Sequence, residues 1–141
     1  GGFLRLKREA AEARRWFESL QVRPIDGVKA EFATFSGGNQ QKIVFGKWLR
    51  TTPSVLLLDE PTQGVDVGAK AELHRRIIQT CADGLAVLVS STDVKELATL
   101  CDRVLFIVSG RMVGEMRGGG FTDISINRTF HEVQSEHGVN S

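Results

Sequence analysis

Two adjacent carboxylates, Asp59 and Glu60, follow the continuous apolar run at residues 55–58. Such a run predicts a strand that is covered on both faces in a parallel sheet. Ligands of open α/β folds usually bind at the carboxyl edge of the sheet. There, one carboxylate can hold Mg²⁺, directly or through water, while its neighbour positions or activates an attacking water. Taken alone, the pattern also fits an ordinary strand followed by an acidic turn.

A second segment with potential chemistry is FSGGNQQK, at residues 35–42. Ser36 is predicted to be the N-cap of a helix that runs to about Arg50. Because Gly37 and Gly38 lack Cβ atoms, their backbone N–H groups can approach an anion, and the positive end of the helix dipole favours the same ligand. A lone Ser-Gly-Gly is a weak signal for an anion site, because its commoner meaning is a serine cap after a flexible loop.

The order and spacing of the two segments carry more information than either one. Ser-Gly-Gly, a helix, VLLLDEPT and then Gly64-Val65-Asp66 follow one another as the signature, Walker B and D-loop motifs of ATP-binding-cassette proteins. Over roughly residues 3 to 117, the sequence resembles the second nucleotide-binding domain of the fused, two-domain ATPases of bacterial simple-sugar importers. This resemblance implies a partial P-loop NTPase fold of the α/β class. A helical signature subdomain would precede a largely parallel β-α-β core that lacks the Walker A strand.

The resemblance also implies ATP and Mg²⁺ as cofactors and assigns a role to each motif. Asp59 would support Mg²⁺, Glu60 would be the catalytic carboxylate, and Asp66 would couple two sites. The signature residues would contact the γ-phosphate of a nucleotide held across an interface with another cassette. The residues expected to bind ATP are Ser36, Gly37, Gly38, Asn39, Asp59 and Asp66. Lys42 and Lys47 are interpreted as a solvated helix face.

The sequence departs from the family pattern at the switch histidine. Counting back from Asp93 places this position at Thr92. A threonine can donate a hydrogen bond to a phosphate but cannot act as an imidazole base, so hydrolysis at this degenerate catalytic position is expected to be poor. The substitution is usual in the sugar-importer type. The histidines of the chain lie in helical or tail contexts and are assigned no catalytic role: His74, His131 and His137.

A second departure is the absence of a P-loop motif, Gly-x-x-x-x-Gly-Lys-Ser/Thr. The Gly-Lys pair at Gly46 and Lys47 lacks the rest of this pattern. The resemblance places the Walker A strand and the glutamine loop upstream of Gly1, so this chain alone is expected to bind ATP weakly and to hydrolyse none. The implied partners are a fused N-terminal cassette, transmembrane permease subunits and, indirectly, a periplasmic sugar-binding protein, at the cytoplasmic face of the membrane.

Composition narrows the alternatives. The 18 basic and 17 acidic residues give a net charge of +1, which argues against nucleic acid as the main partner. No apolar stretch approaches the roughly 20 residues that span a bilayer. Cys81 and Cys101 are predicted to be buried free thiols. Two rival functions stay open: a non-transport cassette ATPase acting on DNA or ribosomes, and a non-catalytic module that regulates a partner cassette.

Periodicity indicates the elements that must position these residues. Residues with helical spacing predict an amphipathic first helix: Leu6, Ala10, Ala13, Phe17 and Leu20. A helix is expected over about residues 67–82, with these apolar residues available to face inward: Ala71, Leu73, Ile77, Ile78 and Cys81. Strands are expected at residues 85–89, 103–108 and 112–115, with a capped helix beginning after Asp93 and a turn at Ser109-Gly110. By motif, the chain divides into a helical subdomain (1–52), an α/β region (53–117) and a C-terminal linker with a weak helix (118–141).

Overall fold

The computed structural model describes residues 2–136, and side chains from residue 7 onward except that of residue 26. The described residues form two compact units. The first unit runs to Leu56 and also includes Pro61–Leu88, and the second comprises Leu57–Glu60 and the chain from Val89 onward. None of the helices within residues 2–136 is long and apolar enough to span a membrane. The division by motif at residues 52 and 117 therefore does not coincide with the boundaries of the compact units.

The first unit begins with helix α1 (Gly2–Ser19) and two short 3₁₀ turns, η1 (Ile25–Lys29) and η2 (Phe32–Thr34). Of the expected inward face of α1, Phe17 is half-buried and Ala10 is exposed, while the next residue in the pattern, Leu20, is buried just beyond the helix. The rings of Phe17 and Phe35 meet edge to face, with centroids 5.8 Å apart. The end of α1 therefore anchors the segment that leads into the next helix.

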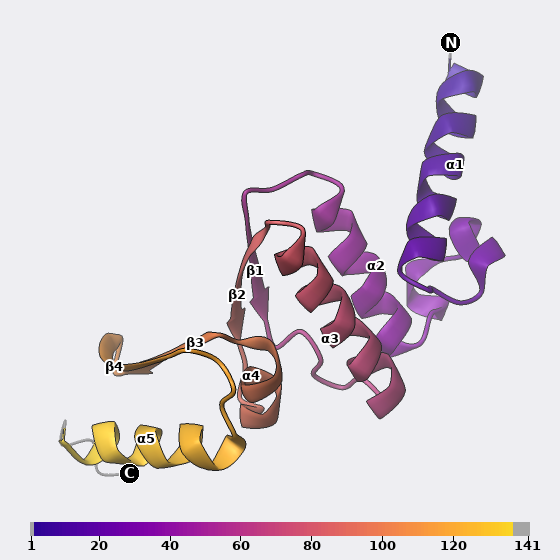
Figure 1. Ribbon diagram of the computed structural model, residues 1–141. Coiled ribbons are helices and arrows are strands. Elements are labelled where there is room, and N and C mark those ends of the chain that lie inside the picture. The colour runs from indigo at the N-terminus through magenta and orange to yellow at the C-terminus, as the bar shows by residue number, and fades with distance from the viewer. Residues whose placement is uncertain (1, 137–141) are drawn as a thin grey trace. The chain divides into compact units, whose positions relative to one another are not determined.

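Helices α2 (Gly37–Leu49) and α3 (Val67–Ala82) lie side by side in this unit, as Figure 1 shows. The bounds of α3 are those predicted from the sequence. Its buried side chains include Leu73 and Ile77. Of the apolar residues available to face inward, three are exposed: Ala71, Ile78 and Cys81. A helix places residues one position apart about 100° around its axis, so a single packing partner covers only a narrow stripe of α3.

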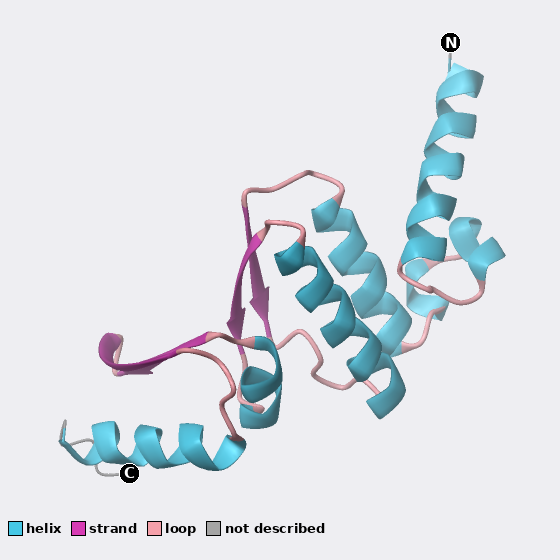
Figure 2. Cartoon of the chain, viewed as in Figure 1, coloured by secondary structure: helices cyan, strands magenta, loops and turns pink. Residues whose placement is uncertain are grey.

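Strands β1 (Val55–Asp59) and β2 (Ala86–Ser90) form a two-stranded sheet, and Figure 2 shows their arrowheads pointing the same way. The expectation that residues 55–58 are covered on both faces is wrong within this chain. Leu56 is buried, whereas the side chain of Leu57 is 70% exposed. Because successive strand residues point to opposite faces, only one face of β1 is covered.

The second unit contains helix α4 (Val94–Leu100), strands β3 (Arg103–Val108) and β4 (Arg111–Arg117), and helix α5 (Asp123–Glu136). The strands pair antiparallel around a two-residue loop. Both loop residues have positive φ, 50° at Ser109 and 76° at Gly110, as a type I′ turn requires. The predicted hairpin is therefore confirmed, with β4 longer than the 112–115 expected.

Helix α5 covers one face of this hairpin and packs on both of its strands (Figure 2). The core of the unit joins Val104 and Phe106 of β3 to Ile126 of α5. A Cβ atom on Gly114 would lie 2.9 Å from the side chain of Val133, so the glycine in β4 permits the close approach of α5. Burial of Ile126, at 2% exposure, makes α5 an integral part of the second unit.

Candidate functional site

The residues predicted to act on nucleotide fall into two groups, one in each compact unit. The signature group in the first unit comprises Ser36, Gly37, Gly38, Asn39 and Asp66. The acid group in the second unit comprises Asp59, Glu60 and Thr92. Sequence motifs far apart in the chain are thus brought together within each unit.

Ser36 is the N-cap residue of α2, as predicted, but its side chain makes no capping hydrogen bond. Its Oγ instead accepts a hydrogen bond from Asn39 Nδ2, at 3.1 Å. The first N–H groups of a helix have no partner within the helix. Because the serine hydroxyl does not occupy them here, the exposed backbone at Gly37 presents donors and the positive end of the helix dipole to any anion that approaches.

The side chain of Asn39 is tied to the backbone of Arg23. Its Nδ2 donates to the Arg23 carbonyl at 3.0 Å, and its Oδ1 accepts from the Arg23 N–H at 3.1 Å. Together with the bond to Ser36, these contacts engage both amide hydrogens and the amide oxygen. A direct contact between Asn39 and a nucleotide is therefore left to its backbone N–H, while its side chain holds the loop after α1 against α2.

The two glycines of the signature have different surroundings. A Cβ on Gly38 would lie 2.5 Å from the Cβ of Ala69, so this buried glycine is required by the close packing of α2 on α3. A Cβ on Gly37 would meet only the carbonyl oxygen of Gly64, at 3.4 Å. The missing Cβ thus serves helix packing at Gly38, whereas at Gly37 it leaves space beside an exposed backbone. Contact of either glycine with an anion stays a prediction.

Asp66 lies beside this contact and caps α3. Its Oδ1 accepts a hydrogen bond from the N–H of Ala69, at 2.9 Å. The negative charge of the carboxylate also stabilises α3, because the N-terminus of a helix carries partial positive charge. Within the first unit, the predicted signature therefore lies next to the predicted D-loop. Gly38 packs on Ala69 at the start of α3, and the N–H of Ala69 binds Asp66.

A shallow cleft of about 350 Å³ opens between these two helix starts. It is lined by Ser36 and Asn39 on one side and by Asp66 and Gly68 on the other, and it reaches Lys42 and Glu72. The interpretation of Lys42 as a solvated residue is wrong: the residue is only 6% exposed, and its Nζ lies 3.4 Å from Glu72 Oε2. Lys47, one turn further on, is exposed as predicted.

Sequence reasoning missed Lys42 and Glu72 because each looks like an ordinary polar helix residue. Lys42 follows Gly38 by four positions, and Glu72 follows Ala69 by three. Each charged residue therefore lies on the same face as one partner of the Gly38–Ala69 contact. That spacing is a usable signal only once the contact between the two helices is known.

In the acid group, Glu60 has an unusual backbone. Its φ is 45°, in the left-handed region that non-glycine residues seldom adopt. Its N–H donates to the Ser90 carbonyl at 2.8 Å, and its side-chain Oε1 accepts from the N–H of Thr92 at 2.7 Å. Glu60 is therefore held through both its backbone and its side chain, at the point where β1 and β2 finish. Uncommon backbone conformations of this kind concentrate at functional sites.

Thr92 contributes to this arrangement through its backbone N–H. Its residue position is exposed, as is that of Asp59 at the end of β1. The histidines lie elsewhere in the described structure: His74 is buried in α3, and His131 of α5 contacts the ring of Phe130, with centroids 6.1 Å apart. His137 lies outside the described residues.

The carboxylates of the acid group fit an Mg²⁺ ion shared with a substrate better than a metal ion held by protein side chains alone. Within residues 2–136, no three side chains of His, Cys, Asp or Glu come together as metal ligands. Mg²⁺ usually binds through one or two carboxylates together with waters and substrate phosphates. The exposed carboxylate of Asp59, at a strand end, is suited to such a shared site.

Comparisons with known proteins agree with this geometry. Residues 5–63 match the family described as ABC transporter. A ribose import ATP-binding protein of Streptomyces coelicolor is 48% identical over 77% of this chain and 21% of its own length. One from Rhizobium meliloti is 38% identical over 96% of this chain and 27% of its own length. The chain thus spans about a quarter of the length of these curated relatives.

Solved structures give the same answer for the fold. A nucleotide-free ATP-binding cassette from an ABC transporter superposes with a TM-score of 0.76 at 19% identity, covering 94% of this chain and 51% of that one. The ADP conformation of another such cassette gives a TM-score of 0.71 at 21% identity, covering 93% and 51%. The fold and the order of its motifs define an ATP-binding cassette. The chain belongs to the ABC transporter family, and the expected partial α/β cassette fold is confirmed.

Proposed function

We propose that this chain supplies two parts of the composite nucleotide sites of a sugar importer's ATPase: a signature for a nucleotide bound by another cassette, and carboxylates for its own site. The observation that carries the proposal is the exposed start of α2, where the N-cap serine leaves the helix amides free for a phosphate. The ribose import ATP-binding proteins at 38–48% identity support the transport role over an ATPase acting on DNA or ribosomes.

At the signature, Ser36 and Gly37 would meet the γ-phosphate. The Ser36 hydroxyl can still donate a hydrogen bond, because in the bond with Asn39 it is the acceptor. The backbone of Gly37 is exposed and has room for a close anion. Gly38 and Asn39 then act mainly by shaping this end of α2, and Asp66 by capping the neighbouring helix.

At the acid group, Glu60 would orient and deprotonate the attacking water. Its Oε1 is engaged by the Thr92 N–H, so Oε2 is the oxygen left to accept the proton. Asp59 would hold Mg²⁺, which supplies charge neutralisation to the β- and γ-phosphates when it is bound. Thr92 cannot supply an imidazole, and we expect slow hydrolysis at this site.

The remaining parts of the site must come from outside these 141 residues, since their sequence holds no P-loop motif. We infer a longer polypeptide with a P-loop, a second cassette fused on the N-terminal side, and permease subunits as membrane partners. A periplasmic sugar-binding protein would deliver the solute to those subunits. The ATPase would lie at the cytoplasmic face of the membrane.

Phosphate release tests this proposal. The complete ATPase is expected to hydrolyse ATP with Mg²⁺, and Glu60→Gln, which keeps the size of the side chain but removes the base, is expected to abolish most turnover. The 141-residue chain alone is expected to show no turnover above its own Glu60→Gln control. Hydrolysis by the isolated chain that exceeds this control would contradict the composite-site proposal.

A further inference from the structure

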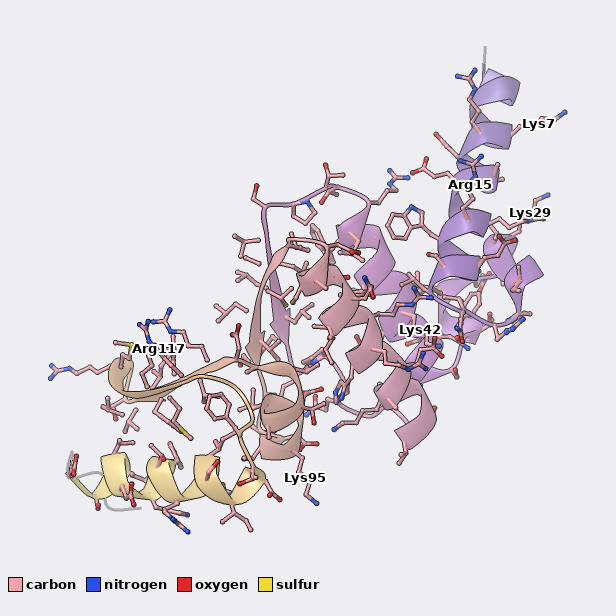
Figure 3. The ribbon with its side chains drawn as sticks, in the orientation of Figure 1. Lys7, Arg15, Lys29, Lys42, Lys95 and Arg117 are labelled. Atoms are coloured by element: carbon pink, nitrogen blue, oxygen red, sulfur yellow. The ribbon has the colours of Figure 1, made fainter. Side chains whose placement is uncertain are left out.

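The buried ion pair between Lys42 of α2 and Glu72 of α3 has no part in the proposed nucleotide chemistry. Lys42 Nζ lies 3.4 Å from Glu72 Oε2, and the two side chains are 8% and 13% exposed. Figure 3 labels Lys42. Burying two charges is unfavourable unless they are paired with good geometry, so this contact is a specific feature of the interface between the helices.

Lys42 also binds a third element. Its Nζ donates to the carbonyl oxygen of Gln21, at 3.3 Å, in the loop that follows α1. Gln21 has a positive φ of 52°, an uncommon conformation for this residue type. One turn earlier on α2, Asn39 binds the backbone of Arg23 in the same loop. The first two turns of α2 therefore carry the side chains that fix it to both neighbours.

The ion pair lies directly next to the tightest contact of the two helices. Gly38, one turn before Lys42, packs on Ala69, one turn before Glu72, with no room for an added Cβ. The contact between the small residues Gly38 and Ala69 sets the distance between the two helices. Because it has no protruding side chain, it does not stop one helix from sliding or rotating on the other. The pair of opposite charges, four residues after Gly38 on α2 and three after Ala69 on α3, restricts this sliding and rotation.

We propose that Lys42 and Glu72 are positioning residues that hold the start of α2 in register with the start of α3. The pair keeps the exposed backbone of Gly37 beside Gly64 and the Asp66 cap, and so fixes the signature relative to the D-loop. This inference rests on the proposed function for its consequence in ATP hydrolysis, but not for its structural content.

Glu72 adds one further observation. Its second carboxylate oxygen, Oε1, is buried and has no hydrogen-bond donor among the described residues. A lysine ammonium engages one oxygen here, whereas the fork of a guanidinium can engage both. Lys42→Arg is therefore a conservative change that keeps the charge and can satisfy the second oxygen.

The test separates positioning from simple stability. Lys42→Met alone removes the nearer cation and leaves the Glu72 carboxylate with the exposed guanidinium of Arg75, at 4.0 Å. This variant is expected to lower the unfolding midpoint by roughly 5–10 °C. The double variant Lys42→Met with Glu72→Met replaces the pair with apolar side chains of similar length and is expected to restore the midpoint. In the complete ATPase, the folded double variant should still lose about tenfold in kcat, with the KM for ATP changed by less than about threefold.

Hydrogen exchange of a backbone amide in α2 is a second readout, and it does not depend on ATP hydrolysis. The amide of Gln40 closes the first turn of α2 by bonding to the Ser36 carbonyl, at 2.9 Å. Its hydrogen exchange is expected to be about tenfold faster in the double variant and unchanged in Lys42→Arg. Lys47→Met, at an exposed position on the same helix, is the matched control and should change neither exchange nor kcat.

A folded double variant with wild-type kcat and wild-type Gln40 exchange would overturn the positioning role. If the double variant does not fold, Lys42→Arg decides, because a folded arginine variant with kcat reduced tenfold is incompatible with the proposal. If the unmodified ATPase fails to hydrolyse ATP, the proposed function fails, and the exchange of Gln40 alone then decides whether the ion pair positions α2.

Discussion

The backbone N–H of Thr92 donates a hydrogen bond to Glu60 Oε1 across 2.7 Å. The residue at the predicted degenerate switch position therefore holds the predicted catalytic carboxylate through its backbone and without its side chain. Any residue with a backbone N–H can make this contact. If residue 92 is the switch position, as the resemblance implies, threonine there supplies no imidazole but leaves the anchor of Glu60 in place.

Proline and alanine at residue 92 separate these two roles. Thr92→Pro removes the N–H, and the loss of a hydrogen bond to a charged group is worth about 1.5–3 kcal/mol. We expect kcat of the complete ATPase to fall about ten- to hundredfold, the ratio that such an energy gives. Thr92→Ala keeps the N–H and is expected to stay within about threefold of the unmodified protein. Equal losses in both variants would mean that the hydroxyl, and not the backbone, supports Glu60.

The two signature glycines should respond differently to alanine. Gly38→Ala places a methyl group 2.5 Å from the Cβ of Ala69 and is expected to cost about 1–3 kcal/mol of unfolding free energy. Gly37→Ala meets only the Gly64 carbonyl at 3.4 Å and should change stability by less than about 0.5 kcal/mol. Urea unfolding monitored by circular dichroism measures both.

A compensating change tests the cause of the Gly38 effect. Removing the opposing methyl group, in Gly38→Ala with Ala69→Gly, should recover much of the stability, minus the cost of about 1 kcal/mol for a glycine inside α3. No recovery would mean that the methyl group of Ala69 is not the obstacle. Loss of ATP hydrolysis in a stable Gly37→Ala variant would in turn support close approach of a phosphate at Gly37.

Local signals in the sequence were enough to predict several elements. Helical periodicity predicted α3 with its observed bounds, and the turn at Ser109-Gly110 between two expected strands predicted the β3–β4 hairpin. At the site, Ser36 was correctly predicted as the N-cap of α2. These features depend on residues close to one another in the chain, which is why one sequence suffices to find them.

Features that depend on tertiary contacts were not accessible in the same way. The pairing of Lys42 with Glu72 depends on which faces of α2 and α3 meet, and a charged residue on a helix is more often solvated. The open face at Leu57 was missed because an apolar run does not say what covers it. The tie between Glu60 and the Thr92 backbone has no side-chain signature at all.

Thiol labelling tests the fold directly, because the two cysteines differ in exposure. Both were predicted to be buried, and this prediction is wrong for Cys81. Neither Cys81 nor Cys101 is in a disulfide. Cys81, near the end of α3, is exposed, whereas Cys101 after α4 is half-buried against the hairpin core. A maleimide should therefore modify Cys81 well before Cys101 in the folded chain, by roughly tenfold in rate. Mass spectrometry after short labelling times measures the two rates, and in denaturant they should become equal. Faster labelling of Cys101 would contradict the packing of the second unit.

The hairpin carries a charge cluster whose pH dependence can be predicted with its sign. Side-chain hydrogen bonds from Arg117, then Arg103, hold the pKa of Glu115 below its ordinary value of 4.5, and Figure 3 labels Arg117 on β4. A carboxyl group with a lowered folded-state pKa stabilises the fold above pH 4.5, and this contribution disappears as the pH falls through the folded-state value. Glu115→Gln should therefore be less stable than the unmodified chain at pH 7, and the difference in unfolding midpoint should shrink steadily below pH 4.5. Because the cluster is accessible to solvent, added salt should reduce the difference at pH 7 as well. A difference that stays constant from pH 7 to pH 3 would show that Glu115 acts through packing instead of through its charge.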